Sequence, residues 1–172
     1  MPWDLLSRML SQGSSSKAGP SHDGSTLGPV AAAEIAMEFA SLSSPGACPR
    51  GIYMTPSPEA LSKWEGVFFV HSGPYSGAIL RFVMAFKPDF PHTAPVIRFE
   101  SEVFHPLIDP KTKVWHPHGP ISQWRPRIHH VVHFLSDLRR SFQIAVLDNI
   151  MDSEAVNKQI WSQVLPPSAT SP

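Results

Sequence analysis

The chain has 172 residues, 42% of them hydrophobic, which is enough for one domain with a substantial core. Its 14 basic and 14 acidic residues cancel, which argues against nucleic acid or an anionic membrane as a partner. No apolar run approaches the roughly 20 residues of a membrane span, and the first residues lack the pattern of a signal peptide. With Cys48 as its single cysteine, the chain forms no internal disulfide, and we expect a cytoplasmic protein.

Residues 1–28 are predicted to form a flexible N-terminal segment. Trp3, Leu6 and Leu10 fall at helical spacing, and the stretch that follows them is rich in serine and glycine. Two interpretations of the apolar residues remain open, namely a disordered terminus and a short helix that folds onto a partner. We expect one folded domain over residues 29–165 and a disordered tail over residues 166–172.

The folded part is predicted to start with a helix over residues 29–42. Pro29 suits a first helical turn, and Ile35, Phe39 and Leu42 form an apolar stripe. The segment "IYMTP" is predicted to be an edge strand because prolines confine it. Two longer apolar segments, joined by the turn "SGPYSG", predict a β-hairpin, and "APVIRFE" predicts a further strand. We therefore expect an antiparallel meander of about four strands.

Residues 106–127 show no periodicity and are predicted to form a long ordered loop. A helix over residues 127–142 follows, with Ile128, Val131 and Leu135 on its apolar face. Ser153 is predicted to cap a last helix that carries Ile160 and Trp161. Helices separated along the chain from an antiparallel meander indicate the α+β class.

These features together resemble the ubiquitin-conjugating (E2) fold over about residues 29–164. The run "GPYSGAILRFVMAFKPDFPHTAPVIRFESEVFHP" is similar to the E2 succession of hairpin, strand, proline-rich turn and His-Pro, and "WRP" is similar to the Trp-Ser-Pro that follows an E2 active site. The motif "VFHPLIDP" resembles most closely E2 variants of the fused-toes family, also called AKT-interacting proteins. The segments "GIYMTPS", "WEGVFFV" and "IHHVVHFLSDLRRSF" have counterparts in that family.

Two departures from the E2 pattern predict a catalytically inactive protein with a vestigial site formed by His105, Pro106, Leu107, Trp115, His116 and Trp124. E2 enzymes carry asparagine after His-Pro, where this chain has Leu107. Family spacing places the nucleophilic cysteine at His116. A thioester needs a sulfur nucleophile that is also a good leaving group, which histidine does not provide. Cys48 precedes the sheet and is expected to be a partly buried thiol.

The resemblance implies an adaptor that binds a coiled-coil Hook-type protein and a Hook-interacting protein and links vesicles or endosomes to dynein. One alternative is a ubiquitin-binding variant that assists an active E2 or sorts cargo. A second is an active conjugating enzyme, which the missing cysteine disfavours. For the adaptor, we predict a partner surface on the last helix at Ile160, Trp161 and Val164, because tryptophan is common at interface hot spots.

The remaining histidines and tryptophans have simpler explanations. His129 and His133 lie one helical turn apart, and His116 and His118 are close in sequence, but neither pair has a recognised zinc spacing, so we expect no metal and no cofactor. His105 is predicted to be structural, bonded to the backbone of its loop. Trp115 and Trp124 are predicted to anchor the loop, whereas an exposed Trp115 would indicate a binding surface.

Overall fold

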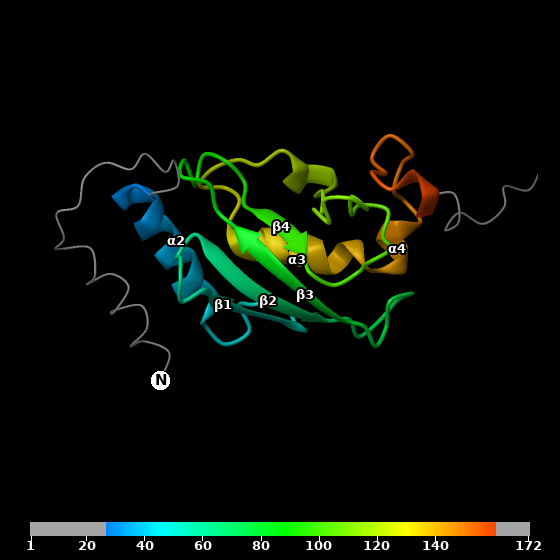
Figure 1. The fold of residues 1–172 in the computed structure, drawn as a ribbon, viewed down its shortest axis with the longest axis horizontal. Helices are drawn as coiled ribbons and strands as arrows, with labels where there is room; N and C mark the ends of the chain where they lie inside the picture. The colour runs from blue at the N-terminus through cyan, green and yellow to red at the C-terminus, as the bar shows by residue number, and fades with distance from the viewer. Residues whose placement is uncertain (1–26, 161–172) are drawn as a thin grey trace, which may run out of the picture.

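A computed structural model describes residues 27–160 of the chain. The elements in chain order are helix α2, strands β1 to β4, the short 3-10 helix η1, and helices α3 and α4 (Figure 1). The strands form one antiparallel sheet in the order β1-β2-β3-β4, which is a meander. The α+β prediction, with an N-terminal helix, four strands, a long loop and C-terminal helices, is therefore confirmed.

Helix α2 spans Pro29–Leu42, as the sequence predicted. Proline occupies its first turn, where the missing N–H would have no helical partner. The buried positions recur at spacings of three and four residues and face the core: Ala31, Ile35, Glu38 and Leu42. A carboxylate on this buried stripe requires a polar partner from another element.

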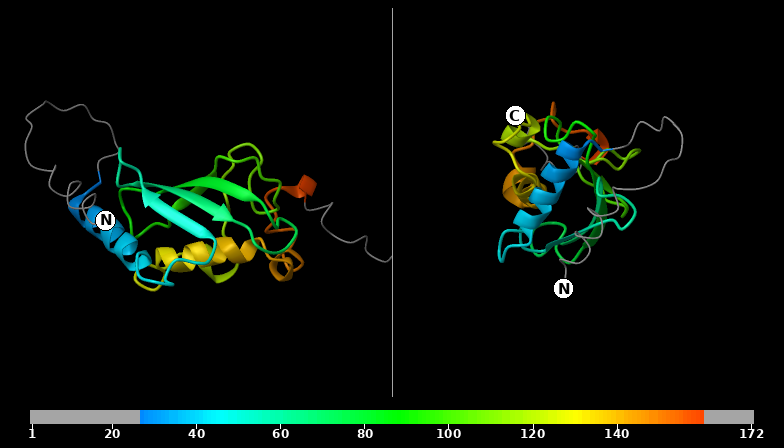
Figure 2. Two further views of the ribbon diagram at one scale, coloured as in Figure 1. Left: turned by 90° about the horizontal axis from the view of Figure 1, so that it is seen from below. Right: turned by 90° about the vertical axis from the view of Figure 1, so that its left-hand side faces the viewer.

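The sheet consists of β1 (Ile52–Pro56), β2 (Lys63–Phe69), β3 (Ile79–Ala85) and β4 (Val96–Phe99). Inward side chains alternate with outward ones, and the inward set builds the core with Trp64, Phe82 and Phe99. Helix α3 crosses behind the strands in Figure 1, and the views of Figure 2 show α3 along one face of the sheet. Strand β1 lies at the edge of the sheet, as predicted from its prolines.

The loop after β4 is ordered, as predicted. The Phe99 N–H donates to the Lys113 carbonyl and the Trp115 N–H to the Ile97 carbonyl, both at 2.9 Å. A piece of the loop therefore covers the free edge of β4. The 3-10 helix η1 (Gly119–Ser122), which the sequence did not predict, buries Ile121 farther along the loop.

Helix α3 spans Val131–Ser141 and begins later than predicted. Arg127 has φ 65°, in the left-handed region, so a right-handed helix cannot start there. The side chain of Ile128 is 58% exposed, and its predicted place on the apolar face was therefore wrong. Val131 and Leu135 are buried on α3, as predicted.

The C-terminal part differs from the prediction in two ways. A short helix, α4 (Ile144–Leu147), follows α3 and was not predicted. Ser153 lies in a turn and does not cap a helix, because the helical residues begin at 158, where the Ile160 N–H donates to the Asn157 side chain at 3.3 Å. Within residues 27–160, no helix is both long enough and apolar enough to cross a membrane.

Candidate functional site

The residues singled out from the sequence divide between the core and the surface of the loop. His105, Pro106, Leu107 and Trp115 are buried, His116 is exposed, and Trp124 is half-buried. The loop brings Leu107 and His116 together, because the His116 N–H donates to the Leu107 carbonyl at 2.8 Å. Ile108 and Trp115 form a β-bridge beside this contact. The loop is thus closed on itself at the candidate site.

His105 has a structural role, as predicted. Its Nδ1 accepts the Leu107 N–H at 3.1 Å, so Nε2 carries the proton and donates to the Ser141 carbonyl at 2.9 Å. The ring joins the start of the loop to the end of α3 and lies 4.5 Å, between ring centroids, from Phe142. Burial lowers the pKa of His105 to about 4 despite the bond to Ser141, so the ring is neutral at pH 7.

Leu107 points into the core and leaves 1% of its surface exposed. An asparagine amide at this position would have to be satisfied by buried partners rather than by a group at the surface of the loop. His116, which occupies the position expected for a nucleophile, has its side chain in solvent. The two positions are joined through the backbone, while Leu107 is directed into the core and His116 is exposed.

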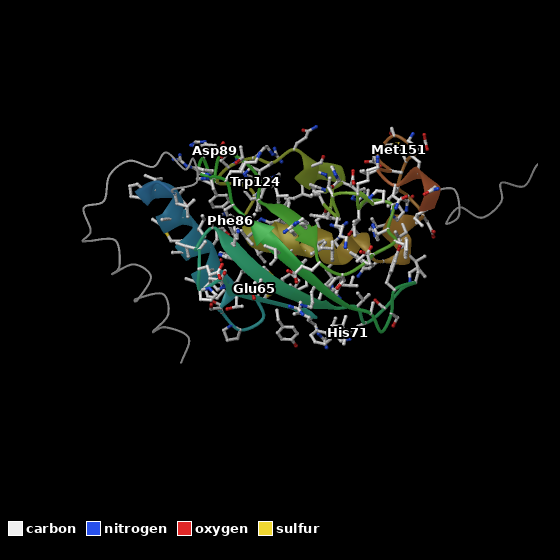
Figure 3. All side chains as sticks on the ribbon, viewed as in Figure 1. Glu65, His71, Phe86, Asp89, Trp124 and Met151 are labelled. Atoms are coloured by element: carbon white, nitrogen blue, oxygen red, sulfur yellow. The ribbon has the colours of Figure 1, made fainter. Side chains whose placement is uncertain are left out.

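The two loop tryptophans are anchors. Trp115 is buried and packs edge-to-face on Phe134 of α3 with ring centroids 5.2 Å apart, which contradicts the alternative of an exposed binding surface. Trp124 donates its indole N–H to the Pro91 carbonyl at 2.8 Å and also packs on Phe134. Figure 3 shows Trp124 beside the segment that carries Asp89. Both rings fix the loop between the sheet and α3.

Sequence reasoning missed the role of Glu38, which joins α2 to the start of α3. One carboxylate oxygen contacts Nδ1 of His130 at 2.8 Å, and the other accepts the Val131 N–H at 2.9 Å. The His130 N–H in turn donates to Nδ1 of His133 at 3.0 Å. The signal in the sequence was a glutamate on the apolar face of a predicted helix, because a buried carboxylate requires partners.

Asp137 of α3 was also missed. The Asp137 Oδ2 and the His118 Nδ1 are buried, and neither has a hydrogen-bond partner among the described residues. Burial raises the pKa of Asp137, and the neighbouring His118 and the Arg140 guanidinium oppose the shift. A depression of about 260 Å³ beside it is lined by His129, His133 and Arg140, among others.

The rings of His129 and His133 accept hydrogen bonds from the backbone near the start of α3. Nδ1 of His129 accepts the Arg125 N–H at 3.1 Å, and Nδ1 of His133 is already bonded to the His130 N–H. Within residues 27–160, no three histidine, cysteine, aspartate or glutamate side chains gather in a group that could hold a metal ion. These contacts give His129, which precedes α3, and His133, on its first turn, a role in shaping the start of the helix.

A family model described as ubiquitin-conjugating enzyme matches residues 35–165. The chain belongs to the ubiquitin-conjugating enzyme family. This match, together with curated relatives named crossbronx, confirms the resemblance to E2 variants predicted from the sequence.

Two of the relatives are insect proteins. A protein crossbronx homolog of Anopheles gambiae is 32% identical over 117 residues, which cover 67% of this chain and 51% of the relative. A protein crossbronx-like of Drosophila sechellia is 30% identical over 131 residues, covering 66% of this chain and 49% of the relative. The chain therefore spans about half the length of these curated relatives.

Solved E2 structures share the fold. The structure of human ubiquitin-conjugating enzyme E2 G1 superimposes with a TM-score of 0.59 at 21% identity, covering 68% of this chain and 98% of that one. A structure titled novel ubiquitin-conjugating enzyme gives the same TM-score and identity over 74% of this chain. At this identity the likeness concerns the fold alone.

The single thiol of this E2-family chain lies apart from the loop. Cys48 follows α2 and precedes β1, and it donates to the Ile52 carbonyl at 3.2 Å. It is partly buried, as predicted, and burial raises its pKa. A thiol with a raised pKa is a poor nucleophile at neutral pH, because the thiolate is the reactive form.

The predicted partner residues are only partly described. Ile160 is half-buried at the beginning of the last helical segment, whereas Trp161 and Val164 lie outside the described residues. The N–H groups of Val156 and Asn157 both donate to the Pro106 carbonyl at 2.9 Å. The chain that leads to Ile160 is therefore tied to the loop of the candidate site.

Proposed function

We propose that this E2-family chain is a catalytically inactive adaptor. It binds a coiled-coil Hook-type protein and a Hook-interacting protein, as the fused-toes resemblance implies, and links vesicles or endosomes to dynein in the cytoplasm. In this proposal the loop at residues 105–124 is a vestigial E2 active site with a structural role.

The pair formed by Leu107 and His116 carries the proposal. His116 is exposed where the family has its nucleophile, and its imidazole offers no sulfur for a stable thioester. Leu107 is buried and has no side-chain donor for a developing oxyanion. One such donor contributes roughly 2.7–4 kcal/mol to the stability of a transition state. Both chemical requirements of ubiquitin transfer are therefore unmet at this loop.

Cys48 offers no replacement. Its thiol lies on the segment between α2 and β1 and is bonded to the Ile52 carbonyl. The burial that raises its pKa reduces the thiolate fraction. A ubiquitin-loaded cysteine must also leave readily and sit beside a group that stabilises the oxyanion.

The first test is a charging reaction with E1, ubiquitin and ATP, resolved on a non-reducing gel. We expect no reducible ubiquitin adduct on this chain, since neither His116 nor Cys48 meets the requirements. Cys48→Ser is the matched control, because it removes the only thiol. An adduct that forms on the natural chain and disappears in Cys48→Ser would contradict the proposal.

The second test measures the partner. A purified coiled-coil segment of the Hook type is titrated against the full chain, Trp161→Ala and Trp3→Ala, with circular dichroism as the check on folding. We expect Trp161→Ala to weaken binding at least tenfold and Trp3→Ala to leave it unchanged. Binding of ubiquitin without binding of the coiled coil would favour the ubiquitin-binding alternative and overturn the adaptor.

A further inference from the structure

Two histidine rings hold the backbone that leads into α3. Nδ1 of His129 accepts the Arg125 N–H at 3.1 Å. Nδ1 of His133 accepts the His130 N–H at 3.0 Å. A ring nitrogen that accepts a hydrogen bond carries no proton, so each ring is neutral with its proton on Nε2. An imidazolium donates from both nitrogens and accepts at neither, and each of these bonds therefore requires a neutral ring.

The bond to His133 occupies a sensitive position of the helix. His130 is the N-cap residue of α3, and His133 is the third residue of the helix. In many proteins a glutamine or glutamate at this third position accepts the N-cap N–H, and the bond stabilises the first turn. Within residues 27–160, the amides of Arg125 and His130 bond to no other acceptor. Protonation of the rings thus leaves both amides unsatisfied by the described part of the chain.

The groups around the two rings do not favour a proton on them. Burial lowers the pKa of His129, and the Arg125 guanidinium and the neighbouring His133 lower it further. Since the folded pKa of His129 lies below the ordinary 6.5, the stability that the neutral ring contributes is present above pH 6.5 and is lost as the pH falls through the folded value.

The surrounding charges come from α2, from the loop and from α3. Both oxygens of Glu38 on α2 are occupied, Oε1 by His130 and Oε2 by the Val131 N–H, so this carboxylate does not pair with the accepting rings. The rings line the depression of about 260 Å³ beside η1, which contributes no charged side chain to it. The remaining titratable or charged groups near the rings are Arg125, His118, Asp137 and Arg140.

We propose that the backbone over residues 125–130 is a proton-sensitive switch, closed while the rings of His129 and His133 are neutral and open when both are protonated. Bonds that do not involve these rings limit the opening at either end. Trp124 stays bonded to the Pro91 carbonyl, and the Val131 N–H stays bonded to Glu38. Opening changes the wall of the depression, because both rings form part of it.

The test is amide hydrogen exchange, measured residue by residue by NMR on the full chain at pH 7.5 and pH 5.5. Each rate is divided by the intrinsic rate at the same pH, which gives a protection factor. We expect the protection of the Arg125 and His130 amides to fall at least about fivefold at pH 5.5, the size typical of a lost cap. His105 stays largely neutral at this pH because its pKa is about 4.

The decisive variant is His133→Gln, at an exposed position. Glutamine at the third helical position accepts the N-cap N–H and does not titrate. We expect equal protection of the His130 amide at both pH values in this variant. The Arg125 amide, which His129 still holds, should keep its pH dependence and serves as the internal control. His92→Gln, an exposed histidine elsewhere, should behave like the natural chain.

Two results would overturn the proposal. One is a loss of His130 protection in His133→Gln as large as in the natural chain, and the other is a natural chain that shows no loss at either amide. The nitrogen shifts of the rings give an independent measurement on the natural chain. We expect His129 and His133 to be protonated on Nε2 alone at pH 7.5, and a proton on Nδ1 of either ring would contradict the switch.

Discussion

At the scale of single residues, His105 links the pH of the solution to the stability of the loop. Its folded pKa of about 4 lies below the ordinary 6.5, so the unfolded chain binds more protons between these values. Stability contributed by the neutral ring is present above pH 6.5 and is lost as the pH falls toward 4. The shift of the pKa from 6.5 to about 4 corresponds to about 3 kcal/mol of stability that is lost when the ring becomes protonated.

We therefore predict that the free energy of unfolding falls between pH 7 and pH 4.5 and that His105→Gln reduces this fall. Glutamine does not titrate, and it keeps one donor and one acceptor. His92→Gln, at an exposed position, is the matched control and should keep the natural pH dependence. The measurement is urea unfolding at several pH values. The same slope in His105→Gln as in the natural chain would show that His105 does not titrate in this way.

A second prediction at the residue scale concerns Leu107 and His116 and whether ubiquitin loading can be restored there. Combining His116→Cys with Leu107→Asn in a Cys48→Ser background should not restore ubiquitin loading. The new thiol is exposed, but the amide at 107 points into the core, and a misplacement of about 1 Å can cost roughly 100-fold in rate.

Rapid reaction of His116→Cys with a maleimide provides the control, because it shows that the sulfur is accessible. The charging assay then tests the geometry alone. Ready formation of a reducible ubiquitin adduct on the double variant would mean that the loop retains a working E2 arrangement.

At the scale of elements, α3 depends on a residue of another helix for its first turn. The N-cap position is His130, and the Val131 N–H is satisfied by Glu38 of α2. We predict that Glu38→Ala destabilises the chain by about 1–3 kcal/mol, because it leaves a buried donor without a partner. The free energy of unfolding of Glu38→Gln should lie between that of Glu38→Ala and that of the natural chain.

The matched control is Glu34→Ala, one turn earlier on the same helix. It should change the free energy of unfolding, measured by chemical denaturation, by less than about 0.5 kcal/mol. Equal losses in Glu38→Ala and Glu34→Ala would show that the contact with α3 contributes nothing.

The same contact explains which elements the sequence could predict. Helix α2 and the meander follow from local patterns, namely Pro29 with its apolar stripe and the alternation of the strands. The start of α3 is fixed by the contact of Glu38 with the Val131 N–H and by the left-handed backbone of Arg127. The first is a tertiary contact and the second a local backbone conformation, and hydrophobic periodicity predicts neither. Serine is a residue type that commonly caps helices, which is why Ser153 was predicted as the cap, but the side chain of Asn157 accepts the Ile160 N–H at the start of the last helical segment.

At the scale of the whole molecule, the sequence predicted the fold better than the arrangement of the candidate site. The motifs located the loop and its anchors Trp115 and Trp124. They did not reveal that Leu107 faces the core, since burial depends on how the loop folds back on α3. The hydrogen bonds of the His129 and His133 rings were also beyond prediction, because they depend on the backbone conformation before α3.

The pairing of the loop with β4 has a consequence for how this molecule meets others. Lys113 and Trp115 occupy the backbone groups of that edge strand, and β1, at the opposite edge, is short and ends in Pro56. An extended peptide thus finds no free ladder at β4 and only a short one at β1. Main-chain pairing with another chain is therefore blocked at β4 and confined to the five residues of β1, which reduces the tendency toward edge-to-edge aggregation.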